Sequence, residues 1–216
     1  MPMPTTPEPS PPPGPRRRRS VRVALAAGRA PGWYAGRVAV GDAATTDRDA
    51  RRLVTAVAGL RAGASRTGDW GAAIRGQDLN AWLATDLPRN HAAALPTGIR
   101  EPRVVLEPGR IRVAARAGAG PLAGTVSLVV EPRLRAPNQL ELAVSEARFG
   151  AVPIPAGPFV HRVAAVCGRL GLVTNVRRLD GRSVVVVSWG GRGVVLRGLS
   201  VNDGELVIAG TTEEAR

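Results

Sequence analysis

The sequence predicts an α+β fold, with a curved, mainly antiparallel β-sheet, two N-terminal helices and one helix between two groups of strands. Three observations predict it. Apolar residues first recur every three or four positions, over about 46–87, and from Arg103 they alternate with polar residues. Short turns join most of the alternating segments. Antiparallel strands joined by short turns, with helices in separate blocks, are typical of α+β domains.

Two amphipathic helices are expected before the sheet. The first follows Thr46, whose hydroxyl suits a helix N-cap, and is expected at about 46–62. The second is expected at about 76–87, where Pro88 ends it. The apolar residues at helical spacing are Leu53, Val54, Val57 and Leu60 in the first helix, and Leu79, Trp82, Leu83 and Leu87 in the second.

Four strands are expected between Arg103 and Phe149. The first two form a hairpin around a Pro-Gly turn, and the next two are expected at about 125–135 and 139–149. In the last of these the apolar residues change phase after Val144. Because a shift of one residue moves every side chain to the opposite face, the sequence predicts a β-bulge near 145–146.

A third helix is expected after the proline-rich segment 152–155, with Pro158 in its first turn. Alternating segments then predict three final strands. A Gly-Gly pair joins the first two, and a tight Asp-Gly turn joins the last two. These strands are expected at about 182–189, 193–201 and 205–209.

A single folded domain is expected over 46–210, because 216 residues with 44% hydrophobic composition are enough for one core. Residues 1–20 are rich in proline and arginine and are expected to be a disordered tail. Residues 21–45 are expected to be a linker or a degenerate membrane-anchor segment, since the apolar run is short and contains Arg22. Residues 211–216 are expected to be a second tail.

The formal net charge is +13, and all of the basic residues are arginine. The lack of lysine excludes lysine Schiff-base chemistry and phosphate loops that depend on a lysine. A basic surface favours an anionic partner, such as an anionic membrane, an acidic polymer or nucleic acid. The arginines expected to contact such a partner lie in the tail and on the polar face of the sheet: Arg16, Arg17, Arg18, Arg19, Arg110, Arg112, Arg133 and Arg135.

Nucleic acid is the less favoured of these partners. Proteins that bind single strands place aromatic side chains beside their basic residues, so that the bases stack on them. The sequence predicts no aromatic residue on the arginine-rich face of the sheet, and it places Glu131 and Glu141 there. We therefore interpret this face as a solvated surface of mixed charge.

The sequence predicts no catalytic residues, no metal site and no cofactor. A Ser or Cys nucleophile needs a base in reach, usually a histidine, and the two histidines are His91 and His161. His161 and Cys167, six residues apart on one predicted helix, face different sides of it. Cys167 lies on the apolar stripe and is interpreted as a buried apolar side chain. The acidic pairs lack the His or Cys neighbours that a transition metal requires.

The segment Gln77–Leu83 resembles the E-L-N-x-x-L helix of the YpmS-like bacterial proteins of unknown function. The segments 102–104, 152–155 and 203–204 are similar to the rest of that family's pattern, so the resemblance covers about 46–210. It implies an extracytoplasmic α+β domain at the cell envelope, with an N-terminal membrane anchor and a relation to tubular lipid-binding folds. It implies no functional residues, because the family's activity is undefined.

The leading hypothesis is a non-enzymatic, envelope-associated domain that binds lipid or another apolar ligand. Asn80, Trp82 and Leu83 are the candidate ligand-binding residues; the alternative is that Asn80 makes a helix-cap contact and Trp82 anchors the core. The alternative function is an arginine-rich protein that binds nucleic acid or an acidic polymer. The sequence leaves open whether helices fill the apolar face of the sheet or leave a cavity for a ligand.

Overall fold

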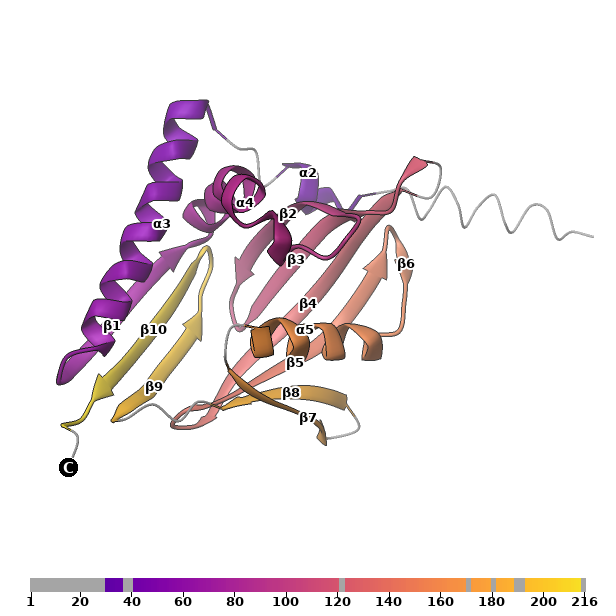
Figure 1. The fold of residues 1–216 in the computed structure, drawn as a ribbon. Helices are drawn as coiled ribbons and strands as arrows, with labels where there is room; N and C mark the ends of the chain where they lie inside the picture. Colours follow the sequence, from indigo (N-terminus) through magenta and orange to yellow (C-terminus); the bar gives the residue numbers. More distant parts are fainter. Residues whose placement is uncertain are drawn as a thin grey trace, which may run out of the picture.

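The computed structural model describes residues 30–36, 41–120, 123–169, 172–179, 182–188 and 193–214. These residues confirm the α+β class (Figure 1). The described helices are α2 (Gly32–Gly36), α3 (Ala43–Ala64), α4 (Gly76–Asn90) and α5 (Gly157–Arg169), with a 3₁₀ turn η1 at Ala92–Ala94. The described strands are β1 (Gly68–Arg75), β2 (Ile99–Glu107), β3 (Arg110–Ala117), β4 (Gly124–Ala136), β5 (Gln139–Phe149), β6 (Val152–Pro153), β7 (Val173–Leu179), β8 (Arg182–Ser188), β9 (Val194–Val201) and β10 (Glu205–Thr212).

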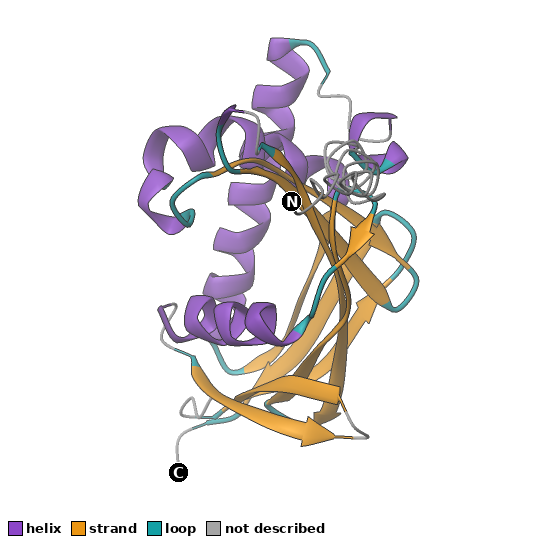
Figure 2. Ribbon diagram, turned by 90° about the vertical axis from the view of Figure 1, so that its right-hand side faces the viewer, coloured by secondary structure: helices purple, strands orange, loops and turns teal. Residues whose placement is uncertain are grey.

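The strands form two antiparallel sheets. The long sheet has the order β2-β3-β4-β5-β8-β7, with β6 added beside β5, and the short sheet has the order β1-β10-β9. Figure 2 shows that the long sheet curves and that the longer helices lie on its concave side. None of the described helices combines the length and the hydrophobicity that crossing a bilayer requires.

Two separate apolar clusters hold α4 and α5 against the long sheet. The α4 cluster contains the buried side chains of Val104, Leu106 and Val201, with Leu79 and Leu83 of α4 packed on them. The α5 cluster joins that helix to β5, β7 and β8, and its buried members are Val144, Val160, Val185 and Val187. Burying such side chains stabilises the fold by about 1.5–3 kcal/mol each.

Polar contacts join the two sheets at the ends of β9. At one end Asn138, in the β4–β5 turn, donates from Nδ2 to the Val194 carbonyl (2.8 Å) and accepts from the Leu196 N–H (2.7 Å). At the other end the Gly109 N–H donates to the Val201 carbonyl, and the Gly204 N–H donates to the Leu106 carbonyl. The short sheet is therefore fixed to the hairpin ends of the long sheet.

The expected β-bulge is confirmed. Val129 of β4 lies opposite Glu146, but the next residue, Val130, lies opposite Val144, so Ser145 has no partner in the register. The bulge lets Val144 and Ala147 both point to the apolar face, where they are 5% and 3% exposed.

The structure adds three strands that the sequence patterns did not predict: β1, β7 and the two-residue strand β6. It also moves several boundaries. The helix α4 continues through Pro88 to Asn90, because a proline in the last turn removes few helical hydrogen bonds. The strand β10 runs to Thr212, two residues into the segment expected to be a tail, and α2 lies inside the segment expected to be a linker.

Candidate functional site

The three candidate ligand-binding residues of α4 make different contacts. Asn80 is buried, Trp82 is half-buried against the His91 ring with 5.5 Å between ring centroids, and Leu83 packs on the α4 cluster. The sequence grouped the three because they are close along the helix. The structure does not bring them together around one cavity.

Asn80 fastens α4 to the outer edge of the long sheet. Its Nδ2 donates to the carbonyls of Val104 (2.7 Å) and Gly76 (2.8 Å), and its Oδ1 accepts from the Val104 N–H (2.8 Å). Both donor hydrogens are used, and the amide pairs with Val104 as a neighbouring strand would. These contacts support the structural alternative for Asn80 over direct ligand binding.

The arginines predicted on the polar face of the sheet are paired with acids. Glu107 contacts both Arg110 (2.6 Å) and Arg112 (3.0 Å). Arg133 lies 3.4 Å from Glu131, and Arg135 lies 2.6 Å from Glu141. Each exposed pair adds little stability, but the pairs cancel much of the positive charge on this face. Arg16, Arg17, Arg18 and Arg19 lie outside the described residues.

The expectation that no aromatic residue lies on the arginine-rich face was wrong. Trp33 of α2 lines an open hollow of about 410 Å³ together with Arg112 and Arg148. The neighbouring Tyr34 holds α2 in place by donating from its hydroxyl to the Glu101 carbonyl (2.7 Å). The only local signal was the Trp-Tyr pair itself, since α2 is too short to show a periodic pattern.

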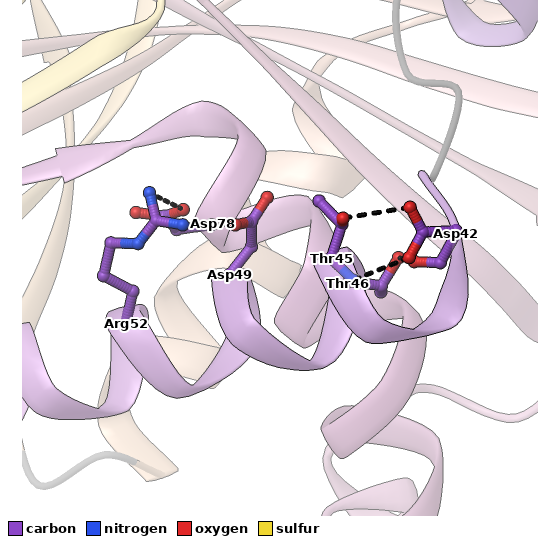
Figure 3. Close-up of polar contacts among 6 residues, drawn as sticks. All are labelled: Asp42, Thr45, Thr46, Asp49, Arg52 and Asp78. Atoms are coloured by element: carbon purple, nitrogen blue, oxygen red, sulfur yellow. Dashed lines mark hydrogen bonds and ion pairs between the residues drawn. The ribbon is translucent and has the colours of Figure 1, made fainter.

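Polar contacts at the start of α3 and at its junction with α4 form a second cluster (Figure 3). Asp42 caps α3 by accepting from the Thr45 N–H (2.9 Å) and hydroxyl (3.0 Å), and these hydrogen bonds lower the pKa of Asp42. Further along the helix, Arg52 contacts Asp49 and lies 3.6 Å from Oδ1 of Asp78 in α4. An open hollow of about 600 Å³ lies beside this junction and reaches the β9–β10 turn.

Asp78 is only 5% exposed, and its Oδ1 has no hydrogen-bond partner among the described residues. Burial raises the pKa of Asp78; the charge of Asp49 acts in the same direction, whereas Arg52 and Arg75 oppose it. The ionised form of the Asp78 carboxyl group is therefore less stable in the folded protein than in water. It is a poorly solvated structural group, held by the α3–α4 contact beside a separate, smaller hollow of about 210 Å³.

Asp78→Asn is expected to raise the free energy of unfolding at pH 7 by about 1 kcal/mol, because it removes a poorly compensated buried charge. The raised pKa means that the folded native protein binds a proton more tightly than the unfolded chain does. The stability of the native protein therefore rises as the pH falls through the raised pKa of Asp78. The stability advantage of the variant shrinks over the same range, down to the ordinary aspartate pKa of 3.8. Urea unfolding at pH 7 and pH 4 measures both effects.

The exposed Asp203 supplies the control, since Asp203→Asn changes the same charge in water and is expected to leave stability within about 0.5 kcal/mol. A loss of stability on Asp78→Asn at pH 7 would show instead that the Arg52 contact outweighs the burial.

The described residues offer little for catalysis. His91 pairs with Asp86 (Nε2 to Oδ2, 3.3 Å), and His161 is exposed on α5. Cys167 is half-buried against the α5 cluster, and burial raises the pKa of its thiol. Neither imidazole contacts a hydroxyl or a thiol in the described part of the chain. No group of three His, Cys, Asp or Glu residues suited to a metal ion occurs there either.

The centre of the concave face is a candidate binding surface. Two rows of apolar residues cross β3, β4 and β5 there, and in each row neighbours lie directly opposite one another. The rows are Val113–Leu128–Ala147 and Ala115–Val126–Phe149. In the described part of the chain α4 packs on β2 and α5 on β5, β7 and β8, and neither helix packs extensively on β3 or β4.

The larger side chains at this centre are incompletely covered, whereas Ala115 and Ala147 are buried. Val126, Val130 and Phe149 are half-buried, and they belong to neither of the two described clusters. Val113 and Leu128 are also half-buried, and they pack on the edges of the α4 and α5 clusters respectively. The helices therefore cover the two sides of the concave face and leave a half-covered apolar strip between them. We name the strip formed by Val113, Val126, Leu128, Val130 and Phe149 the central strip.

Comparisons of this chain with protein-family models, with curated proteins and with solved structures find no match. The site is therefore interpreted from its own geometry and chemistry.

Proposed function

We propose that this protein binds an elongated apolar ligand, such as the acyl chain of a lipid, along the central strip. The observation that carries the proposal is the half-buried apolar strip on β3 and β4, between the two helices that cover the rest of the concave face. Exposing such a strip to water is unfavourable, and burying it under an acyl chain gains about 25 cal/mol for each Å² removed from water.

The other described surfaces support this choice. The polar face of the sheet carries paired charges, which leaves little unmatched positive charge there for a polyanion. The hollow beside the α3–α4 junction has an apolar wall at 104–106, but Arg75 and three acids, Asp49, Asp203 and Glu205, line it as well. The central strip is apolar, crosses three neighbouring strands and is only half-covered.

A fluorescent fatty-acyl probe tests the proposal directly. Val126→Asn is expected to weaken binding of the probe about tenfold, because the amide must lose its water when the acyl chain covers it. Val129→Asn is the matched control: it makes the same change in the same strand, but Val129 points to the opposite face and lines the hollow beside Trp33. It is expected to leave binding unchanged.

The salt dependence of binding separates the proposal from the polyanion alternative. Binding of the acyl probe should hardly change with salt, whereas phosphate binding weakens steeply as salt rises. Absence of probe binding by the native protein would contradict the proposal, as would equal losses in the two valine variants.

A further inference from the structure

The end of the molecule formed by α5 and β7 carries a strong local excess of positive charge. Between residues 157 and 188, the segment that contains α5, β7 and β8, the chain has five arginines and a single acid, Asp180. On the polar face of the long sheet, by contrast, acids lie among the arginines and pair with them. This end of the fold therefore carries more positive charge than its own acids can balance.

Several exposed side chains at this edge form what we name the β7 rim. β7 is the last strand of the long sheet, so one side of it has no neighbouring strand among the described residues, and α5 packs on it (Figure 1). The β7 rim consists of Arg162 and Val166 of α5, Val173, Arg177 and Arg178 of β7, and Arg182 at the start of β8. In the strand register Val173, Arg177 and Arg182 lie on the face of the edge away from α5, and Arg178 lies on the α5 face, so the β7 rim includes both faces of the edge.

The arginines of the β7 rim lack carboxylate partners in the described part of the chain. No described acid forms an ion pair with Arg177, Arg178 or Arg182, and Arg162 lies over the Phe159 ring. This distinguishes Arg177 and Arg178 from the paired arginines Arg133 and Arg135 of the same sheet, whereas Arg182 lines a small hollow together with Glu131 and Glu141. Guanidinium groups without an internal carboxylate remain available for phosphates outside the protein.

Two exposed apolar side chains accompany these arginines: Val173 lies on the same face of β7 as Arg177, and Val166 lies one helical turn after Arg162 on α5. Val173 is 68% exposed and Val166 is 39% exposed, which makes them two of the most exposed large apolar residues in the described chain. A surface that combines unpaired cations with exposed aliphatic side chains matches the boundary between headgroups and acyl chains in a bilayer. Nucleic acid supplies phosphates but no apolar phase for the valines, so it fits this surface less well.

We infer that the β7 rim docks onto an anionic lipid bilayer, with its arginines at the phosphates and its valines at the acyl boundary. The inference stands on the charge and exposure of the β7 rim and is independent of ligand binding in the central strip. If both hold, α5 lies between the membrane and the strip, since it packs on β7 and covers one side of the concave face.

Co-sedimentation of the full chain with phosphatidylcholine vesicles, with and without phosphatidylglycerol, tests the inference. Binding is expected only when phosphatidylglycerol is present. Each arginine at an anionic surface contributes about fivefold to partitioning, so the double variant Arg177→Gln/Arg178→Gln is expected to bind roughly 25-fold more weakly. Val173→Ser is expected to weaken binding a few-fold, by removing apolar contact.

The matched control is Arg133→Gln/Arg135→Gln, which changes the net charge by the same amount in arginines that pair with acids. It is expected to change vesicle binding less than about twofold. Equal losses in the two double variants would overturn the inference, because net charge alone would then govern binding.

Two further outcomes would also overturn it. Tighter binding of single-stranded DNA than of vesicles, with no effect of Val173→Ser on either, would assign the β7 rim to nucleic acid. Self-association of the Arg177→Gln/Arg178→Gln variant, with vesicle binding intact, would mean that these arginines only protect an open strand edge.

The Val126→Asn variant is expected to bind vesicles as the native protein does. Failure of the central-strip proposal is therefore measured separately from failure of the membrane inference.

Discussion

Asn80→Ala is expected to lower the free energy of unfolding by about 3 kcal/mol. The substitution removes three hydrogen bonds at once, and it leaves the N–H and the carbonyl of Val104 without their side-chain partner. Val104 is only 8% exposed, and both it and Asn80 line the open hollow beside the α3–α4 junction, so water restores only part of the lost bonding. Each polar group left unsatisfied in such a place costs about 1–3 kcal/mol. Urea unfolding followed by circular dichroism measures the loss.

Asn138→Gly is the matched control, because Asn138 makes the same kind of bidentate contact with β9 at a half-buried turn. Its φ is 59°, a value that glycine adopts without strain, so this substitution removes the amide contacts and leaves the turn intact. Water can reach the freed groups there, and the expected loss is about 1 kcal/mol.

The same variant separates the two interpretations of Asn80. If Asn80→Ala keeps native stability but loses binding of the acyl probe, Asn80 contacts the ligand and its hydrogen bonds with β2 are incidental. A large loss of stability in the absence of any ligand supports the structural role that its three contacts indicate.

Local sequence patterns were enough to predict most of the fold. The helices α3 and α4 were predicted because an amphipathic helix repeats its apolar residues every three or four positions. The bulge at Ser145 was predicted because an extra residue in one strand shifts the alternation of apolar and polar residues by one position. These features depend on neighbours along the chain, which the sequence displays directly.

The strands β1 and β7 were missed because neither has a strong pattern of its own. β1 consists largely of Gly and Ala, which have low strand propensity, and it is a strand because β10 pairs with it over its whole length. β7 lacks regular alternation of apolar residues, and it is stabilised by β8 and α5. Such pairing between distant segments is invisible to a local pattern.

The candidate site was less predictable than the fold. The sequence singled out Asn80, but its main partner, Val104, lies 24 residues away in the chain. The acids that pair with Arg112 and Arg135 lie across the turns of two hairpins, so only the strand register reveals the pairing. Trp33 reaches the polar face through the five-residue helix α2, which no periodicity could indicate. Sites that depend on tertiary contacts need the structure.

Gly210→Ala is expected to lower the free energy of unfolding by about 3 kcal/mol, through overpacking in the short sheet. Gly210 lies directly opposite Trp70 in the β1–β10 register, and a Cβ at position 210 would overlap both the Trp70 ring and the Val195 carbonyl oxygen. The ring cannot move aside freely, because its Nε1 donates to the Thr212 hydroxyl (3.0 Å). The melting temperature is expected to fall by roughly 6–12 °C.

Gly198→Ala tests whether this effect belongs to the position or to glycine in general. Gly198 is in the adjacent strand β9, opposite Ala209, and a Cβ there would meet its nearest neighbour at 3.6 Å, an ordinary contact distance. Its expected effect is within about 0.5 kcal/mol of zero, because alanine also restricts the unfolded chain. If both substitutions lowered the melting temperature equally, the Trp70 ring would not be what excludes a side chain at 210. The alternative would be that the short sheet tolerates no added methyl group between α3 and β9. In that case Ala72→Val, which adds bulk to β1 away from Trp70, would be expected to lower the melting temperature as much as Gly210→Ala does.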